Sequence, residues 1–216
     1  MYILSILIFI ITSGIHLIAS YKQNIKLRAI SKVLILPSLI LFYISKANTV
    51  EIYFVIALIF SWLGDLLLIP KGKLFFTFGG IAFLISHLFF IIAYTSHIES
   101  FKECILIFAI VEIIYISITL VVFKHLTKYL PKFLIVPMFI YLITNASMNS
   151  FAFTLMYSVK DIYTLIIYLG ALSFFVSDTN LFFVRFKVEE QKQNHFVVMF
   201  TYIIAEFLIV LGYLHF

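Results

Sequence analysis

Charged residues and cysteines are scarce in this chain of 216 residues. Asp, Glu, Lys and Arg together make up 12% of it, well below the roughly 25% that is typical of soluble domains. Hydrophobic residues make up 64%, whereas soluble domains contain about 45–50%. The single cysteine, Cys104, allows neither an intrachain disulfide nor a cysteine-based metal cluster. These shortages exclude a soluble globule, a disordered chain and a disulfide scaffold, and they identify an integral membrane protein.

Glycine and proline are also rare, with 7 and 4 residues, whereas phenylalanine occurs 26 times. The apolar residues form long runs, and about 20 such residues are enough for a helix to cross a bilayer. We therefore predict an all-α polytopic bundle of about eight transmembrane helices, which forms a single membrane domain over residues 1–216. The first run carries no positive charge at its start, which favours a membrane span over a cleaved signal peptide. The predicted spans cover residues 2–20, 31–46, 50–69, 74–96, 103–123, 132–151, 161–184 and 196–215.

Basic residues are distributed unevenly between the loops that join these spans. The second, fourth and sixth loops contain only Lys46, Lys102 and Lys160. The other twelve of the 15 basic residues lie in or beside the first, third, fifth and seventh loops, which we call the basic loops. The positive-inside rule assigns such loops to the cytoplasm, so we predict that both chain ends lie on the opposite side of a bacterial inner membrane. The twelve residues are Lys22, Lys26, Arg28, Lys32, Lys71, Lys73, Lys124, Lys128, Lys132, Arg185, Lys187 and Lys192.

Two of the three aspartates, Asp65 and Asp178, fall inside predicted spans. Charged groups in the hydrocarbon core cost several kcal/mol, so such residues are functional candidates. Asp65 precedes Lys71 by six residues and Asp178 precedes Arg185 by seven, which sets both carboxyls about 9–11 Å from the basic loops. Because the two spans run in the same direction, the carboxyls can share one cavity, as paired acid–base chemistry requires. The alternative is that both only hydrogen-bond to neighbouring helices and fix their packing.

The segments around the two aspartates resemble each other. Each combines aromatic residues, a serine, the aspartate and a leucine three residues after it. The two aspartates are 113 residues apart, close to half of the chain. This pattern indicates a parallel duplication of four spans each. The alternative is chance similarity in a chain of strongly biased composition.

Further polar residues lie inside the spans, among them His87, Glu112, Asn145 and Glu206. Each either lines a polar cavity near the aspartates or only forms hydrogen bonds between helices. Two functions follow from these residues: an intramembrane enzyme with paired aspartates, or a small proton-coupled transporter with a relay of buried Asp, Glu and His. The depth of the aspartates, close to the lysines of the basic loops, favours the enzyme.

Several motifs of soluble enzymes are missing from the sequence. It has no glycine-rich phosphate loop, no His-Glu-x-x-His metal motif and no Gly-x-Ser-x-Gly nucleophile elbow. We therefore expect neither a metal nor another cofactor. Because membrane orientation explains the basic residues, we also expect no nucleic-acid partner, and nothing in the sequence calls for an obligate protein partner.

Three motifs, in order along the chain, resemble those of the YhhN-like lysoplasmalogenase family. The first is Ser-x-x-Gly-Asp at 61–65, and the second is Gly-x-x-x-Phe-x-x-x-His at 79–87. The third is the Ser-Asp element that begins at 177 and continues to Arg-Phe at 185–186. Near the end, Tyr-x-x-Ala-Glu at 202–206 is similar to a Tyr-x-x-Ala-Gln stretch, with glutamate in place of glutamine. The resemblance covers nearly the whole chain.

This resemblance implies hydrolysis of the vinyl ether of a lysoplasmalogen, which yields a fatty aldehyde and a glycerophospho-ethanolamine or glycerophospho-choline. It implies that Asp65 and Asp178 are the essential carboxylates, one as acid and one as base. The apolar neighbours of Asp178 make it the preferred acid. The expected binding partners are the lysophospholipid substrate and the surrounding membrane lipids.

The phosphate of such a substrate should contact basic residues near the aspartates. Alternatively, these side chains only follow the orientation rule and extend toward lipid phosphates. The basic candidates are Lys32, Lys71, Lys73, Arg185 and Lys187, and the supporting candidates within the spans are Ser61, His87, Asn145, Ser177, Tyr202 and Glu206.

Overall fold

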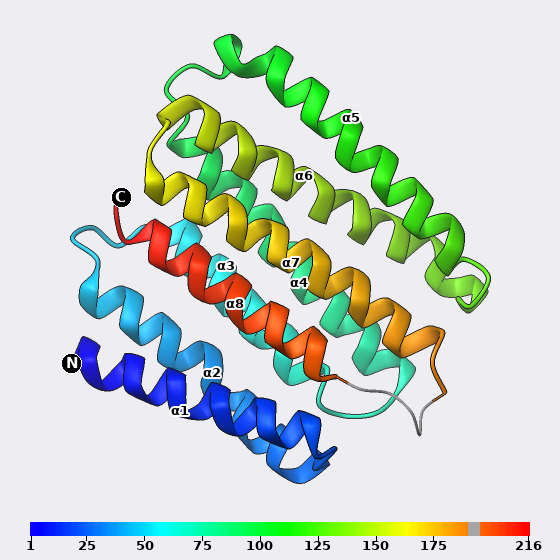
Figure 1. Ribbon diagram of the computed structural model, residues 1–216. Helices are drawn as coiled ribbons and strands as arrows, with labels where there is room; N and C mark the ends of the chain where they lie inside the picture. The colour runs from blue at the N-terminus through cyan, green and yellow to red at the C-terminus, as the bar shows by residue number, and fades with distance from the viewer. Residues whose placement is uncertain (190–194) are drawn as a thin grey trace.

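The computed structural model describes residues 1–189 and 195–216, which form eight α-helices. Of the described residues, 85% are helical and none lies in a strand. Figure 1 shows that the helices run alongside one another and that both chain ends lie at the same end of the bundle. The predicted all-α polytopic bundle is confirmed. The elements are α1 (Tyr2–Tyr21), α2 (Ile25–Lys46), α3 (Ile52–Leu67), α4 (Lys73–Ser96), α5 (Phe101–Leu126), the 3₁₀ turn η1 (Lys132–Leu134), α6 (Ile135–Val159), α7 (Ile162–Phe186) and α8 (Phe196–Tyr213).

Seven of the eight helices are long and apolar enough to cross a membrane, which makes the protein an integral multi-pass membrane protein. The other helix, α3, has 16 residues and is about 24 Å long, less than the roughly 30 Å of the hydrocarbon core. The predicted span over 50–69 was therefore too long. We attribute the end of α3 at Leu67 to Pro70, which disfavours a helical conformation of the residue before it. As a consequence, Asp65 lies in the last turn of α3.

Helix α2 begins at Ile25, six residues before the predicted start at 31. Asn24 caps it, since its side-chain oxygen accepts a hydrogen bond from Leu27 N at 3.1 Å. The charged residues that suggested a loop belong to the first turns of this helix, from which long side chains can reach water. Arg28 and Lys32 are therefore one turn apart on the same helix face.

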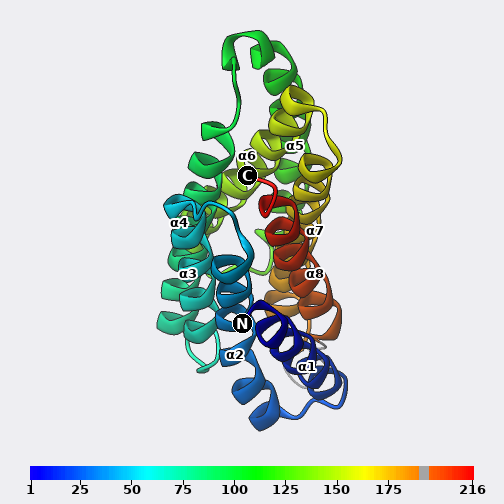
Figure 2. The same ribbon diagram turned by 90° about the vertical axis from the view of Figure 1, so that its left-hand side faces the viewer.

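The helices pack as hairpins of sequence neighbours, with α1 on α2, α3 on α4, α5 on α6 and α7 on α8. In Figure 2, α3 and α4 lie on one side of the bundle and α7 and α8 on the other. Helix α5 lies at the upper edge in Figure 1 and packs mainly on α6. Helix α6 contacts both α4 and α7, and so connects the side of the bundle formed by α3 and α4 with the side formed by α7 and α8.

Pro37 lies inside α2 and leaves the carbonyl one turn earlier without its helical hydrogen bond. That carbonyl belongs to Val33, and Trp62 of α3 donates its indole N–H to it at 3.0 Å. Membrane helices tolerate proline when a neighbour satisfies the freed carbonyl in this way. The contact fixes α3, and hence Asp65, against α2.

Close contact between α7 and α8 depends on two glycines. A Cβ atom on Gly170 would lie 2.9 Å from the carbonyl oxygen of Ala205, and one on Gly212 would lie 2.5 Å from that of Tyr163. Larger residues would force the helices apart, because small residues are what allow such close approach in membranes. The tight pairing holds the polar residues of α7 and α8 beside each other.

Candidate active site

Asp65 interacts with side chains from two other helices. Its Oδ1 is 3.0 Å from Lys32 Nζ of α2, and the Tyr202 hydroxyl of α8 donates to its Oδ2 at 2.9 Å. Only 2% of Asp65 is exposed. A buried carboxylate needs a compensating cation and hydrogen-bond donors, and Lys32 and Tyr202 supply both. The geometry at Asp65 is that of an ionised carboxylate in an ion pair.

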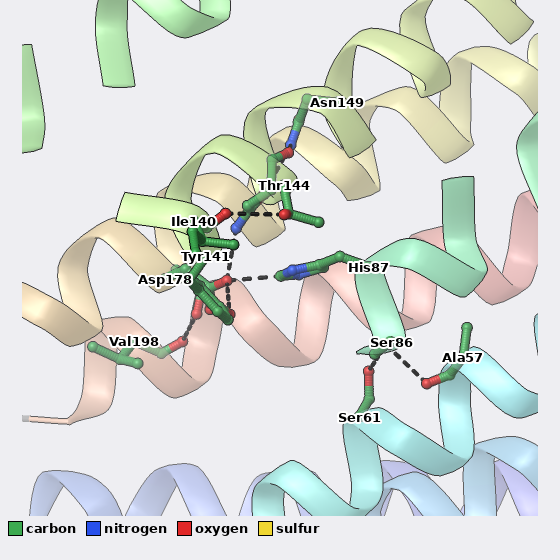
Figure 3. Close-up of polar contacts among 12 residues, drawn as sticks. Ala57, Ser61, Ser86, His87, Ile140, Tyr141, Thr144, Asn149, Asp178 and Val198 are labelled. Carbon is green, nitrogen blue, oxygen red and sulfur yellow. Dashed lines mark hydrogen bonds and ion pairs between the residues drawn. The ribbon is translucent and has the colours of Figure 1, made fainter. Parts of the chain in front are cut away.

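Asp178 of α7 has uncharged hydrogen-bond donors (Figure 3). The Tyr141 hydroxyl and Asn145 Nδ2, both on α6, donate to its Oδ2 at 2.5 and 2.6 Å. His87 Nε2 of α4 points toward the same oxygen at 3.7 Å. The environment of Asp178 is therefore a phenol, an amide and an imidazole, where Asp65 has a lysine.

One cavity of about 240 Å³ contains both aspartates. It extends from exposed Gln23 and Lys71 at the basic loops to the buried carboxyls. The sequence predicted this shared cavity and its position next to the basic loops. Further polar lining residues are His16, Arg28, Lys32, Ser177, Arg185, His195 and Tyr202, and apolar ones include Leu68, Phe76, Phe83, Leu181, Val198 and Met199.

His87 lies behind this cavity rather than among its lining residues. The side chain is fully buried, and neither ring nitrogen has a hydrogen bond of normal geometry among the described residues. Its ring packs edge-on against Tyr141 and Phe174, with centroids 5.3 and 5.0 Å apart. His87 is thus held beside Asp178 by aromatic contacts.

Ser61 and Glu206 are also buried behind the cavity. The Ser61 hydroxyl is 2.8 Å from that of Ser86, which donates to the carbonyl of Ala57 (Figure 3). This pair joins α3 to α4 and is explained by helix packing. Glu206 lies beside Ser61 and Tyr202 without a hydrogen bond of normal geometry to its carboxyl oxygens within the described parts of the chain.

Ser177 lines the cavity and joins α7 to α8, because its hydroxyl donates to the carbonyl of Val198 at 2.9 Å. Asn145 reaches Asp178 directly. Glu112 lies apart from the aspartates on α5, where Ser147 donates to its Oε1 at 2.7 Å. The structure therefore brings Asn145, Ser177 and Tyr202 to the aspartates or the cavity and explains Ser61 by packing.

The predicted phosphate-binding residues separate into two groups. Lys32, Lys71 and Arg185 line the cavity. Lys73 and Lys187 do not, and their ammonium groups lie over the rings of Phe133 and Phe183, 5.7 Å from each centroid. The structure thus keeps these two residues away from the wall of this cavity, because spacing along the chain does not tell which side of a helix end faces inward. Lys192, another residue of the basic loops, lies outside the described residues.

Of the polar residues that the sequence analysis missed, two lie one turn before a residue that it had identified. Arg28 lies one turn before Lys32 on α2 and lines the cavity, and Tyr141 lies one turn before Asn145 on α6 and donates to Asp178. Residues four positions apart share a helix face. Both could have been found by examining the position one turn before each residue that the sequence analysis had identified.

The surroundings of the two aspartates also correspond across the halves of the chain. Lys32 and Asn145 are separated by 113 residues, as are the aspartates that they contact. The same separation relates Arg28 to Tyr141. Helix α2 thus presents two cations where α6 presents two uncharged donors. This correspondence favours duplication over chance similarity.

The contacts that cross between the halves correspond helix by helix, although the two residues that make them are 115 positions apart. His87 of α4 faces the aspartate of α7, and Tyr202 of α8 donates to the aspartate of α3.

Among the described residues, no three His, Cys, Asp or Glu side chains come together as metal ligands.

The fold and this cavity define a polytopic membrane protein with two aspartates of different environment, reached from the basic loops. The chain belongs to the YhhN family: the family model matches residues 27–213, which include both aspartates. The predicted family is thereby confirmed, and this family of lysoplasmalogenases is consistent with hydrolase activity. No curated protein and no solved structure matches the chain.

Proposed function

We propose that this protein hydrolyses the vinyl ether bond of lysoplasmalogens within the membrane, with Asp178 as general acid and Asp65 as carboxylate base. The products would be a fatty aldehyde and a glycerophospho-ethanolamine or glycerophospho-choline. One observation carries the assignment: two aspartates share a cavity, and among the described residues only Asp65 forms an ion pair with a lysine. Two carboxyls with opposite protonation states are what acid–base catalysis of this reaction needs.

The first step protonates the β-carbon of the vinyl ether and gives an oxocarbenium ion. Asp178 suits this step because its donors, Tyr141 and Asn145, are uncharged and leave the carboxyl in a low-dielectric site, where the neutral form is favoured. Both donors contact Oδ2, so Oδ1 is the oxygen that can carry the acid proton. Glycosidases protonate their substrates with a comparable buried acid and form a related cation.

The second step is attack of water on the oxocarbenium carbon. Asp65 suits it because its negative charge, held by Lys32, stabilises the cation and accepts the proton of the attacking water. The resulting hemiacetal then collapses. Asp65 returns its proton to the departing glycerol oxygen while Asp178 takes the hydroxyl proton of the hemiacetal, so both carboxyls regain their starting states.

Aldehyde release from a lysoplasmalogen by the purified protein tests this proposal. Asp65→Asn and Asp178→Asn should each lower kcat by about 10²–10⁴-fold or more, because an amide neither donates the acid proton nor accepts one from water. Glu112→Gln is the matched control, since this membrane carboxyl pairs with Ser147 away from the cavity. Wild-type activity in either aspartate variant would remove that residue from the mechanism.

The same assay separates the enzyme from the proton-coupled transporter that the buried Asp, Glu and His also suggest. A transporter moves its substrate between two compartments without cleaving it, so in detergent solution it would release no aldehyde. Release of aldehyde that depends on both aspartates would therefore exclude a purely transport role for them.

A further inference from the structure

Four side chains from different elements converge at the mouth of the cavity. They are His16 of α1, Arg28 of α2, Arg185 of α7 and His195, which directly precedes α8. All four residues line the cavity, and Arg28 lies one turn nearer than Lys32 to the start of α2 at the first basic loop. No role for His16, Arg28 or His195 follows from the proposed reaction.

Two buried nitrogens at this mouth have no hydrogen-bond partner in the described part of the chain: His16 Nε2 and Arg28 Nε. His16 is only 1% exposed, and its Nδ1 lies 2.9 Å from Ser31 Oγ, which fixes the ring. Buried donors are normally satisfied by protein, water or ligand. Ser31 Oγ donates to the carbonyl of Leu27 at 2.7 Å, so His16 Nδ1 is the nitrogen that donates to Ser31 and the free Nε2 is an acceptor. The orphaned donor is Arg28 Nε, and an orphaned guanidinium nitrogen on a cavity wall indicates a ligand that is an acceptor.

The electrostatics of the mouth specify the charge of that ligand. Burial and then the positive charges of Arg28, Lys32 and Arg185 lower the pKa of His195 from 6.5 to about 4. His16 is the further titratable group that faces His195, from α1. Lys32 is already paired with Asp65, so the two arginines supply positive charge for an anion. Arginine is also the side chain best suited to bind phosphate through two parallel hydrogen bonds.

The spacing between this mouth and the aspartates fits one particular molecule. Arg28 is four residues before Lys32 on the same face of α2, an axial separation of about 6 Å. This is the reach of an extended three-carbon glycerol unit. A lysophospholipid with its phosphate at Arg28 would therefore hold its sn-1 ether oxygen near the level of Lys32 and Asp65.

We propose that Arg28, Arg185 and His195 form the binding site for the phosphodiester anion of the lysophospholipid. The identity of the lipid rests on the proposed function, whereas the anion site itself does not. The site holds the head group at the basic loops and sets the depth of the scissile bond. Arg185 is one of the five basic candidates identified in the sequence, whereas Arg28 is not among them.

Binding of glycerophospho-ethanolamine to the purified protein, measured by calorimetry, tests the site without any turnover. Arg28→Gln and Arg185→Gln should each raise Kd about 10-fold to 100-fold. Lys187→Gln is the matched control from the same loop, because its ammonium lies over Phe183 outside the cavity. Unchanged Kd in both arginine variants would overturn the proposal. Inorganic phosphate should bind more weakly, and tighter binding of phosphate would overturn the assignment to a phosphodiester.

Turnover of two substrates provides the second test. Arg28→Gln should raise KM for a lysoplasmalogen about 10-fold or more with little loss of kcat, since a remote head-group contact is uniform binding. The same variant should leave kcat/KM for a 1-alkenylglycerol, which has no phosphate, unchanged. Equal losses with both substrates would show a structural defect and contradict the site. If neither substrate is hydrolysed by the wild type, the proposed function fails while the calorimetric result still decides the anion site.

Discussion

Replacement of Lys32 by methionine removes the ion pair of Asp65 and leaves the hydrogen bond that Asp65 accepts from Tyr202. The ion pair joins Lys32 Nζ and Asp65 Oδ1 at 3.0 Å, with 14% of the lysine side chain and 2% of the aspartate side chain exposed. Loss of one partner of a buried pair costs about 3–5 kcal/mol, and partial exposure of Lys32 favours the lower end of that range. We expect Lys32→Met to lower the free energy of unfolding by about 3 kcal/mol.

The same change should abolish catalysis through Asp65. Without its cation, the buried carboxyl takes up a proton and can no longer accept one from water, so kcat should fall about 10²–10⁴-fold. The Lys32→Met/Asp65→Asn double variant should regain most of the lost stability and none of the activity. Equilibrium unfolding in detergent micelles and aldehyde release measure the two effects, with Lys187→Met as control. A Lys32→Met variant as stable and as active as the wild type would refute the ion-pair argument.

Three further outcomes follow. A reporter fused after Phe216 should report a non-cytoplasmic location, because the basic loops set the orientation; a cytoplasmic signal would reverse it. Glu206→Gln should keep wild-type kcat/KM, since an amide of equal size fits beside Ser61 and Tyr202; a large loss would make Glu206 a third catalytic carboxyl. Affinity for glycerophospho-ethanolamine should rise as pH falls from 6.5 toward 4. The pKa of His195 is about 4 in the free protein and is raised by the bound anion, so binding takes up a proton in this pH range. Calorimetry should show no such dependence of affinity on pH for His195→Asn.

Most of the fold was predictable from the sequence because each membrane helix is specified by its own apolar run. The errors fell at helix ends. Charged residues delayed the predicted start of α2, although the Asn24 cap extends the helix through them. At α3, leucine and isoleucine before Pro70 continued the apolar run after the helix had already ended at Leu67. Hydropathy reports burial in lipid and does not report where backbone hydrogen bonding stops.

The site was predictable only in part: the two aspartates could be identified, but their partners could not. Asp65 and Asp178 were identifiable because a membrane carboxyl is rare and costly. Their different partners were not identifiable, since Lys32 and Tyr141 lie on other helices and the facing direction of a helix depends on its packing. His16 and His195 were missed for the same reason. A histidine within or just before an apolar helix has no sequence signal that distinguishes a cavity wall from the membrane interface.

Hydrolysis of a lysoplasmalogen in D₂O by the purified wild-type protein tests the central claim most directly. Protonation of the β-carbon by Asp178 predicts a fatty aldehyde with one deuterium on the carbon next to the carbonyl, measured by mass spectrometry. Asp178→Asn should form almost none of this product under the same conditions. No aldehyde from the wild type, or aldehyde without deuterium at that carbon, would contradict acid-catalysed cleavage of the vinyl ether by this pair of aspartates.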